Sequence, residues 1–526
     1  MKKYESTTKN VLKAWYGNHL VLVSESLIVG CLTGLAITLF RKSIDIISAF
    51  RINFYEGTAA LIIKIIVGLT ITALAGLCMG FLIKKYPAIK GSGVSQIKGN
   101  FMQKIVLSPW PELPLKFIGG VLSISTGLSV GREGPSVQIG AYIGSAFEKI
   151  GKQSHIENVC LVTSGAAAGL AATFGAPFAG VVFAIEDLHQ YLSPLLLTCV
   201  MAGAVAGDFI SSIFFKQGAI FNFAGIKLFP LKYFGWLILL GMLTAVAGHI
   251  FKKSIYTSQK IYANLNIPLK FRPLFPFLLS VLVCIFLPFT ASGGDRLIEA
   301  LAEENFTIRI LLVLLAAKII FTGLSAGSGA IGGIFVPLLS CGALMGILFS
   351  KLLTGFSVIE ADYSINLMIF AMAAFFATVI KAPLTAIVLL TETSGNLFHL
   401  GGIILTVFSA YITANLIHSP ANDDVLLKQL LADKTEQKKR GNNAKEEGKQ
   451  MFEIFVSPKS VLDGKLVSQI EWPADCLIVS VARGEEELIP VGKTKISAGD
   501  RLLILTDSEN VNEYIEIIGK MGEAEE

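Results

Sequence analysis

One acidic residue, Glu133, stands inside the glycine-rich stretch Gly131-Arg132-Glu133-Gly134-Pro135, which opens a hydrophobic run. A carboxylate in an apolar environment is costly and is therefore a functional candidate. The start of a helix has free N–H groups and a positive dipole end that attract anions. The Glu133 side chain can occupy such an anion site itself, and its protonation would empty the site. We predict that Glu133 is both a gate and a proton carrier; the alternative is a surface loop in which Arg132 satisfies Glu133.

Two further glycine-rich turns also open hydrophobic runs, Gly91-Ser92-Gly93 and Gly332-Gly333-Ile334-Phe335-Val336-Pro337. Glycine lets a backbone approach a ligand closely. Proline suits the first turn of a helix, because the N–H groups of that turn have no acceptor within the helix and proline lacks this group. Three such helix ends aimed at one point would bind an anion without a buried cation. The alternative is ordinary helix packing through small residues.

A pair of acids, Glu186 and Asp187, ends the apolar run GVVFAIEDL. Acids are unfavourable at the C-terminus of a helix, so a structural cap explains them poorly. We interpret the pair as an entry point for protons from the cytoplasm, with a solvated interfacial acid as the alternative. The repeat described below makes Glu392 equivalent to Glu186, so either glutamate could instead be structural.

Two lysines, Lys116 and Lys318, fall in or beside apolar runs. They either extend to the membrane interface or shape the electric field near an anion path. The six histidines are dispersed, and the seven cysteines include no CxxC pair. We therefore expect neither a metal site nor a disulfide framework.

The elements that must hold these residues are hydrophobic helices. Of the 526 residues, 53% are hydrophobic and only 16% are charged, whereas a soluble domain has about 25% charged residues. This composition excludes a soluble enzyme. Apolar runs recur through the first 420 residues, but several, such as 175–188 and 383–393, are too short to cross a bilayer. Broken helices survive at membrane depth only inside protein or along a cavity, which indicates a channel or transporter.

The chain also contains an internal repeat. The segment TGLSVGREGPSVQIGAYIGSAF from Thr126 resembles TGLSAGSGAIGGIFVPLLSCGALMG from Thr322, and FGAPFAGVVFAIEDL from Phe174 resembles IKAPLTAIVLLTETS from Ile380. The two separations, 196 and 206 residues, are nearly equal. Chance similarity between segments rich in small and apolar residues is therefore the weaker explanation. The repeat predicts a duplicated membrane unit with its substrate site where the repeats meet.

Three regions follow from composition and charge. Residues 1–432 form the membrane unit, residues 433–450 are a charged and flexible linker, and residues 451–526 alternate β-like runs and turns as a small α+β domain. The last region carries a net charge of −8 in a chain whose total is +5, so the remainder carries +13. The positive-inside rule places the basic linker and the C-terminal domain in the cytoplasm.

The motifs resemble those of the CLC family of chloride channels and transporters over about residues 20–430. The resemblance depends on GSGVSQIKG at 91–99, GREGPSVQIGA at 131–141 and GGIFVP at 332–337. It implies an all-α polytopic membrane protein with two inverted repeats of broken helices. It also implies a homodimer with an anion pathway in each subunit. A serine rather than a proline at Ser92 is similar to members that prefer chloride.

The same resemblance assigns site residues. Glu133 matches the gating glutamate and Asp187 the inner proton-transfer acid, with Glu186 as a further candidate. The family's inner tyrosine is missing, and Asn422 or Asp423 stands near its place, which predicts a weaker inner gate. The residues expected to bind the anion are Gly91, Ser92, Arg132, Gly134, Ile334, Phe335 and Val336.

The C-terminal region resembles regulatory domains of the TrkA-C type over about residues 451–520, which implies control by an unidentified small ligand. The sequence therefore predicts a dimeric proton/chloride antiporter of a prokaryotic inner membrane, with a cytoplasmic regulatory tail. We expect no resident cofactor and no nucleic-acid partner. The alternative is a passive chloride channel gated by voltage or protons, which the missing tyrosine favours. A membrane-embedded sensor or enzyme without transport is the third possibility.

Overall fold

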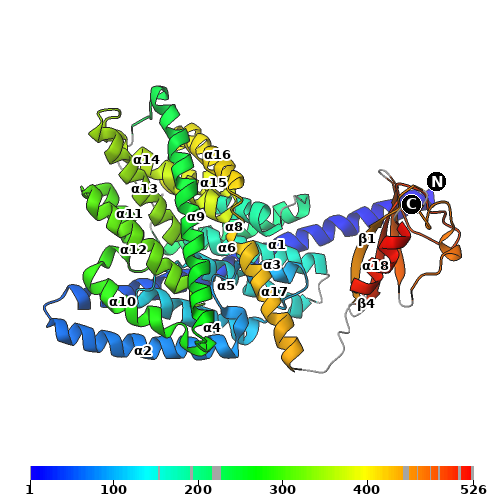
Figure 1. The fold of residues 1–526 in the computed structure, drawn as a ribbon, viewed down its shortest axis with the longest axis horizontal. Coiled ribbons are helices and arrows are strands. Elements are labelled where there is room, and N and C mark those ends of the chain that lie inside the picture. Colours follow the sequence, from blue (N-terminus) through cyan, green and yellow to red (C-terminus); the bar gives the residue numbers. More distant parts are fainter. Residues whose placement is uncertain are drawn as a thin grey trace. The chain divides into compact units, whose positions relative to one another are not determined.

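The computed structural model describes residues 2–151, 155–189, 193–215, 227–441, 449–458, 460–473, 476–483, 486–507 and 511–522. The chain folds as two units, residues 1–431 and 432–526. Each unit has a hydrophobic core of its own. Helices form the first unit, and the second contains the only sheet among the described residues (Figure 1).

The first unit contains two runs of helices in the same order. The first run is α1 (Lys2–Glu56), α2 (Leu61–Lys85), α3 (Val94–Phe101), α4 (Pro109–Ser125), α5 (Glu133–Gly151), α6 (His155–Phe174), α7 (Pro177–Phe183) and α8 (Pro194–Phe214). The second run is α9 (Phe234–Asn264), α10 (Leu274–Phe286), α11 (Asp295–Glu303), α12 (Ile308–Gly327), α13 (Phe335–Gly355), α14 (Ser364–Ile380), α15 (Pro383–Ser394) and α16 (Leu400–Leu416). Corresponding helices have corresponding partners: α5 packs on α6 as α13 packs on α14, and α1 on α8 as α9 on α16. The predicted repeat is confirmed and extends through both runs.

Nine helices of the described residues are long and apolar enough to cross a membrane. Their burial differs widely: 22% of the most apolar window is buried in α2, against 78% in α13. Helix α2 exposes large apolar side chains such as Leu74 and Phe81. Such a surface is more stable in contact with lipid than with water, because a large exposed apolar area is costly to hydrate. The chain is a multi-pass membrane protein, as its composition predicted.

The broken helices lie inside this bundle. Helix α7 and helix α15 are too short to cross a bilayer, and each begins with a proline, Pro177 and Pro383, in its first turn. Glycine serves close packing as well. A Cβ at Gly140 of α5 or Gly165 of α6 would overlap the carbonyl oxygen of the other residue. Helix packing, the alternative explanation for the glycine turns, therefore accounts for part of the glycine content.

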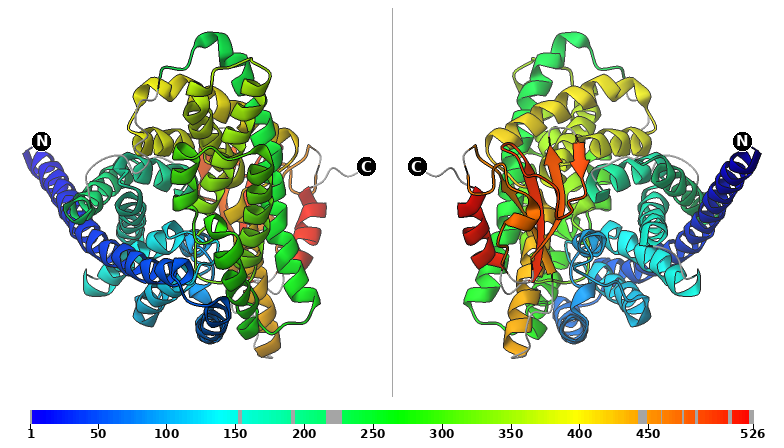
Figure 2. Two further views of the ribbon diagram at one scale, coloured as in Figure 1. Left: turned by 90° about the vertical axis from the view of Figure 1, so that its left-hand side faces the viewer. Right: turned by 90° about the vertical axis from the view of Figure 1, so that its right-hand side faces the viewer.

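The second unit is a small α+β domain. Its strands are β1 (Lys449–Phe455), β2 (Leu477–Arg483), β3 (Glu486–Leu488) and β4 (Arg501–Asp507), and they form an antiparallel sheet in the order β1-β4-β2-β3. Helix α18 (Val511–Gly522) packs beside β1, and Figure 2 shows the sheet and this helix together. Alternate strand residues face the core; they include Phe452, Ile454, Leu502 and Ile504, and Ile518 of α18 packs in the same core. The predicted fold class is confirmed.

The connection between the units differs from the predicted linker of residues 433–450. Helix α17 (Asn422–Gly441) continues into this stretch, and β1 begins at Lys449. Residues 442–448 lie outside the described residues. Lysine, glutamine and glutamate are good helix formers, so a charged composition does not exclude a helix.

Candidate functional site

The glycine turns that open α5 and α13 are bonded to each other. The Gly131 N–H donates to the Gly333 carbonyl at 2.7 Å, and the Gly333 N–H donates back to the Gly131 carbonyl at 2.7 Å. This is an isolated antiparallel bridge. It brings together the starts of two equivalent helices, whose first N–H groups have no partner within the helix. A mutual contact between equivalent residues is also what a twofold relation between the halves produces.

The turn that contains Ser92 joins the same place. The Gly91 N–H donates to the Gly329 carbonyl at 3.3 Å, and the Gly332 N–H donates to the Gly91 carbonyl at 3.2 Å. Ser92 lies directly against the first turn of α5, since a Cβ added to Gly134 would stand 2.8 Å from the Ser92 Cβ. The structure thus gathers all three predicted turns.

The other predicted anion-binding residues lie at the start of α13. Ile334 is the N-cap of this helix, and Phe335 and Val336 begin it. All three are buried. The Phe335 ring makes edge contacts with Phe183 of α7 and Phe376 of α14, at centroid distances of 5.8 and 5.0 Å. Aromatic packing therefore fixes the first turn of α13 between the two halves.

Glu133 is the first residue of α5 and is fully buried. Neither of its carboxylate oxygens has a hydrogen-bond partner among the described residues. The carboxylate lies against Gly131, where a Cβ would overlap Oε2. The side chain thus lies at the helix starts without being fixed there.

Arg132 does not form the surface pair with Glu133 that was the alternative. Its guanidinium nitrogens lie 3.9 Å from Asp45 Oδ1 and 3.8 Å from Asp295 Oδ1. A cavity of about 370 Å³ is lined by all four of these residues. Glu133 therefore borders a space in which water and small ions can meet charges of both signs.

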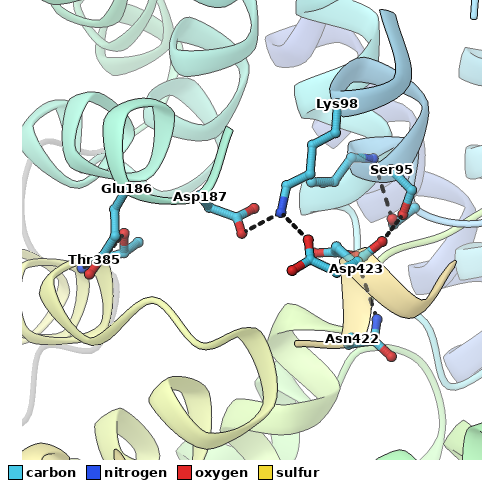
Figure 3. Close-up of polar contacts among 10 residues, drawn as sticks. Ser95, Lys98, Glu186, Asp187, Thr385, Asn422 and Asp423 are labelled. Atoms are coloured by element: carbon cyan, nitrogen blue, oxygen red, sulfur yellow. Dashed lines mark hydrogen bonds and ion pairs between the residues drawn. The ribbon is translucent and has the colours of Figure 1, made fainter. Parts of the chain in front are cut away.

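Asp187 forms a buried ion pair that the sequence did not suggest (Figure 3). It lies in a wide helical turn, Ala184–His189, that continues α7. The Lys98 Nζ of α3 lies 2.8 Å from Asp187 Oδ1 and 3.2 Å from Asp424 Oδ1. The second oxygen of Asp187, Oδ2, has no hydrogen-bond partner among the described residues. The available signal was the lysine inside GSGVSQIKG, because a buried ammonium group needs an acceptor, and an acid is one such partner.

A second cavity, of about 710 Å³, borders this ion pair. Its lining includes Lys98, Asp187, His189, Asp424 and Lys428. Asp187 is therefore buried in protein yet in contact with a space large enough for water.

The described part of the chain contains no group of three or more His, Cys, Asp or Glu side chains that could hold a metal ion.

Glu186, by contrast, is a structural cap. Its Oε1 accepts a hydrogen bond from the Leu384 N–H at 2.9 Å. Its Oε2 accepts bonds from the Thr385 N–H and the Thr385 hydroxyl, both at 2.7 Å (Figure 3). The carboxylate caps the N-terminus of α15 in the other half, not its own helix, so the expectation that Glu186 is not a cap was wrong.

Glu392 makes the equivalent contact in the opposite direction. Its Oε1 accepts from the Phe178 N–H at 3.1 Å, and its Oε2 accepts from the Ala179 N–H at 2.7 Å. It therefore caps α7. The expectation that Glu392 and Glu186 could both be structural agrees with these contacts.

Asn422 and Asp423, the inner-gate candidates, are buried at the start of α17. Asn422 Oδ1 accepts a hydrogen bond from the Tyr256 hydroxyl of α9 at 3.4 Å. The Ser95 hydroxyl of α3 donates to the Asp423 carbonyl at 3.1 Å (Figure 3). A tyrosine hydroxyl therefore lies beside Asn422, although the tyrosine comes from a helix 166 residues earlier.

Lys116 and Lys318 are completely buried, so the expectation that they extend to the membrane interface is wrong. The Lys116 Nζ donates to the carbonyls of Ile89 and Gly91, at 2.9 and 2.8 Å. Among the described residues Lys116 forms no ion pair, and its bond to the Gly91 carbonyl places it behind the turn that contains Ser92. The second interpretation, an effect on the electric field near the anion path, stays a prediction for this lysine.

Lys318 holds a fourth turn, which no sequence motif indicated. Its Nζ donates to the carbonyls of Thr290 and Ser292, at 3.1 and 2.8 Å. The next residues lead to Gly294, whose φ of +115° favours glycine, and to Asp295 at the start of α11. This turn is the second-half equivalent of the one held by Lys116. The sequence gives little sign of this turn, because α11 is short and opens with an acid rather than an apolar run.

A family model described as "Voltage gated chloride channel" matches residues 75–415. The chain belongs to this family, the CLC family. The H(+)/Cl(-) exchange transporter ClcA of Vibrio parahaemolyticus is 30% identical over 423 residues, which cover 78% of this chain and 90% of the relative. The ClcA of Salmonella agona is 30% identical over 439 residues, which cover 81% and 92%. The predicted family is confirmed.

Solved structures agree with this CLC assignment. A slow cyanobacterial Cl-/H+ antiporter has a TM-score of 0.75 at 26% identity, covering 79% of this chain and 99% of its own. A eukaryotic CLC transporter has a TM-score of 0.66 at 22% identity, covering 78% and 74%, and shows the fold alone. A TrkA-C domain model matches residues 451–519. The chain is a CLC membrane unit followed by a TrkA-C domain.

Proposed function

We propose that this CLC protein exchanges chloride for protons across a membrane. The observation that carries the proposal is the buried carboxylate of Glu133, which lies at the joined starts of α5 and α13 with no hydrogen-bond partner in the described part of the chain. A carboxylate fixed by several donors would stay in place, whereas this one can leave when it is protonated. The relatives from Vibrio parahaemolyticus and Salmonella agona are named exchange transporters, which supports the same activity.

Electrostatics links the anion to the proton. An ionised Glu133 and a chloride about 4 Å apart repel by about 4 kcal/mol at an effective dielectric constant of 20. This energy lowers chloride occupancy by nearly three decades, at about 1.4 kcal/mol per decade. Protonation of Glu133 removes the repulsion, so chloride enters as a proton arrives. In this proposal chloride is bound by the Ser92 hydroxyl and by backbone groups of Gly91, Arg132, Gly134, Ile334, Phe335 and Val336.

Asp187 supplies the proton from the inner side in this scheme. Its burial beside a cavity large enough for water suits a group that exchanges protons with solvent and passes them inward. Glu186 has no part in the proton path, because three hydrogen bonds fix its carboxylate as a cap. Asn422 and Asp423 close the inner end of the anion path.

The alternatives are less well supported. The missing inner tyrosine favoured a passive channel, but the named relatives are exchangers. They also indicate a transporter rather than an enzyme or a sensor. We further propose that the protein is a homodimer in a prokaryotic inner membrane, with its TrkA-C domain in the cytoplasm and bound by a small ligand. The family resemblance and the charge distribution support this setting.

Reconstitution tests the proposal. Purified protein in proteoliposomes is given an inward chloride gradient, and chloride flux and external pH are recorded together. We expect chloride entry to drive protons outward against a proton gradient. Chloride flux without any proton movement would show a passive channel, and absence of both fluxes would show that the glycine turns serve packing only.

A further inference from the structure

Three carboxylates and one ammonium group meet where α3, the turn after α7 and the start of α17 come together (Figure 3). The Lys98 and Asp187 side chains are only 6% and 5% exposed, whereas Asp424 is 49% exposed. Asp187 and Asp423 each keep one buried oxygen, Oδ2, without a hydrogen-bond partner among the described residues. The cluster therefore has more carboxylates than Lys98 alone can neutralise, and buried oxygens at which a proton can bind.

We propose that Lys98 is a positioning residue for proton transfer by Asp187 and that it ties this acid to α17 through Asp424. The proposal depends on the proposed function, because it concerns the same proton path. The Lys98 ammonium bonds Asp187 Oδ1 and leaves Oδ2 as the proton-accepting atom. Its charge also offsets the cost of an ionised carboxylate in a buried place. Without Lys98, Asp187 would lose both its orientation and the charge that balances it.

The other charged groups near Asp187 are bonded elsewhere or exposed, which distinguishes them from Lys98. Glu186, the neighbouring residue, turns away to cap α15. His189 stacks on the Phe101 ring at 4.4 Å and bonds the Thr163 hydroxyl at 2.6 Å. Lys428 lines the same cavity but is exposed on α17. Among the described residues, Lys98 is the cation that forms an ion pair with Asp187.

The test compares Lys98→Met with Lys98→Arg in the full-length protein in proteoliposomes, with Lys428→Met as the matched control. We expect Lys98→Met to lower proton flux about tenfold while chloride flux changes less than threefold, so that the chloride/proton ratio rises. The pH profile of proton flux should also change. Lys98→Arg should restore the ratio to within about twofold of wild type, and Lys428→Met should not alter it.

A wild-type ratio in Lys98→Met, including a proportional fall of both fluxes, would overturn the proposal, because it would make the ion pair purely structural. Failure of the proposed function looks different, since wild-type protein would then move no protons. A second comparison covers the case in which Lys98→Met leaves Asp187 unpaired and does not fold. The double variant Lys98→Met/Asp187→Asn removes both members of the buried ion pair, and its chloride flux should equal that of Asp187→Asn within twofold. A further severalfold loss would show that Lys98 does not act through Asp187.

Discussion

Glu186 and Glu392 occupy equivalent places in the two repeats, and each carboxylate caps the short helix of the opposite half. Each acid follows the apolar run of its own broken helix and reaches across to the first N–H groups of the other. The positive end of a short helix is costly to bury without an acceptor. The exchange of caps therefore stabilises α7 and α15 together and joins the two halves.

Removal of one cap should destabilise the protein without changing its coupling. Glu186→Ala leaves the Leu384 and Thr385 N–H groups without their acceptor, at a cost of about 1–3 kcal/mol. We expect the apparent melting temperature in detergent to fall by several degrees, with the same chloride/proton ratio in proteoliposomes. Glu392→Ala should likewise lower the melting temperature and leave the ratio unchanged. A changed ratio at an unchanged melting temperature would return Glu186 to the proton path.

Neutralisation of the gate should separate the two fluxes. In Glu133→Gln the side chain keeps its size but carries neither a charge nor an exchangeable acid proton. We expect proton transport to fall at least about a hundredfold, and chloride flux to lose its dependence on external pH. The measurement is paired chloride and pH recording between pH 4.5 and 7.5. Persistent uphill proton transport in this variant would exclude Glu133 as the proton carrier.

The buried lysine behind the Ser92 turn, Lys116, should strengthen chloride binding. Lys116→Met keeps most of the side-chain length but removes the ammonium and its bonds to the Ile89 and Gly91 carbonyls. We expect chloride affinity, measured by titration calorimetry, to fall about tenfold, equivalent to about 1.4 kcal/mol. Arginine at the same position keeps the charge and serves as the control. Equal affinity in wild type and Lys116→Met would limit this lysine to a structural role.

Protonation of one residue, Asp500, should lower the stability of the TrkA-C domain in acid. Burial alone would raise the pKa of Asp500, but bidentate bonds from Arg483 and a bond from the Ser497 N–H outweigh it and hold the pKa below its ordinary value. A lowered folded pKa stabilises the domain above the unfolded value of about 3.9. This stabilisation is lost as the pH falls through the lower, folded value.

Because the domain has its own core, residues 449–522 can be tested alone by urea unfolding between pH 6 and 3. Asp500→Asn should lower stability at pH 6 and flatten its decline towards pH 3. Glu453→Gln, at an exposed position on β1, should keep the wild-type slope. The same slope in Asp500→Asn and wild type would place the acid sensitivity elsewhere.

The sequence by itself determined the features that depend on neighbours along the chain. Hydrophobic runs, prolines in first turns and glycines before them identified broken helices in two repeats. A lone carboxylate in one such turn identified Glu133. These signals are local, because the free N–H groups of a helix start and the cost of a buried charge follow from a few consecutive residues.

Only the tertiary structure decided which of these groups meet. The bridge between Gly131 and Gly333, the pairing of Lys98 with Asp187 and the cap from Glu186 to Thr385 join residues 89 to 202 positions apart. No local pattern encodes such contacts, since they depend on how whole helices pack. Glu186 is an example. Its place at the end of its own helix gives no reason to expect a cap, and the helix that it does cap belongs to the other repeat.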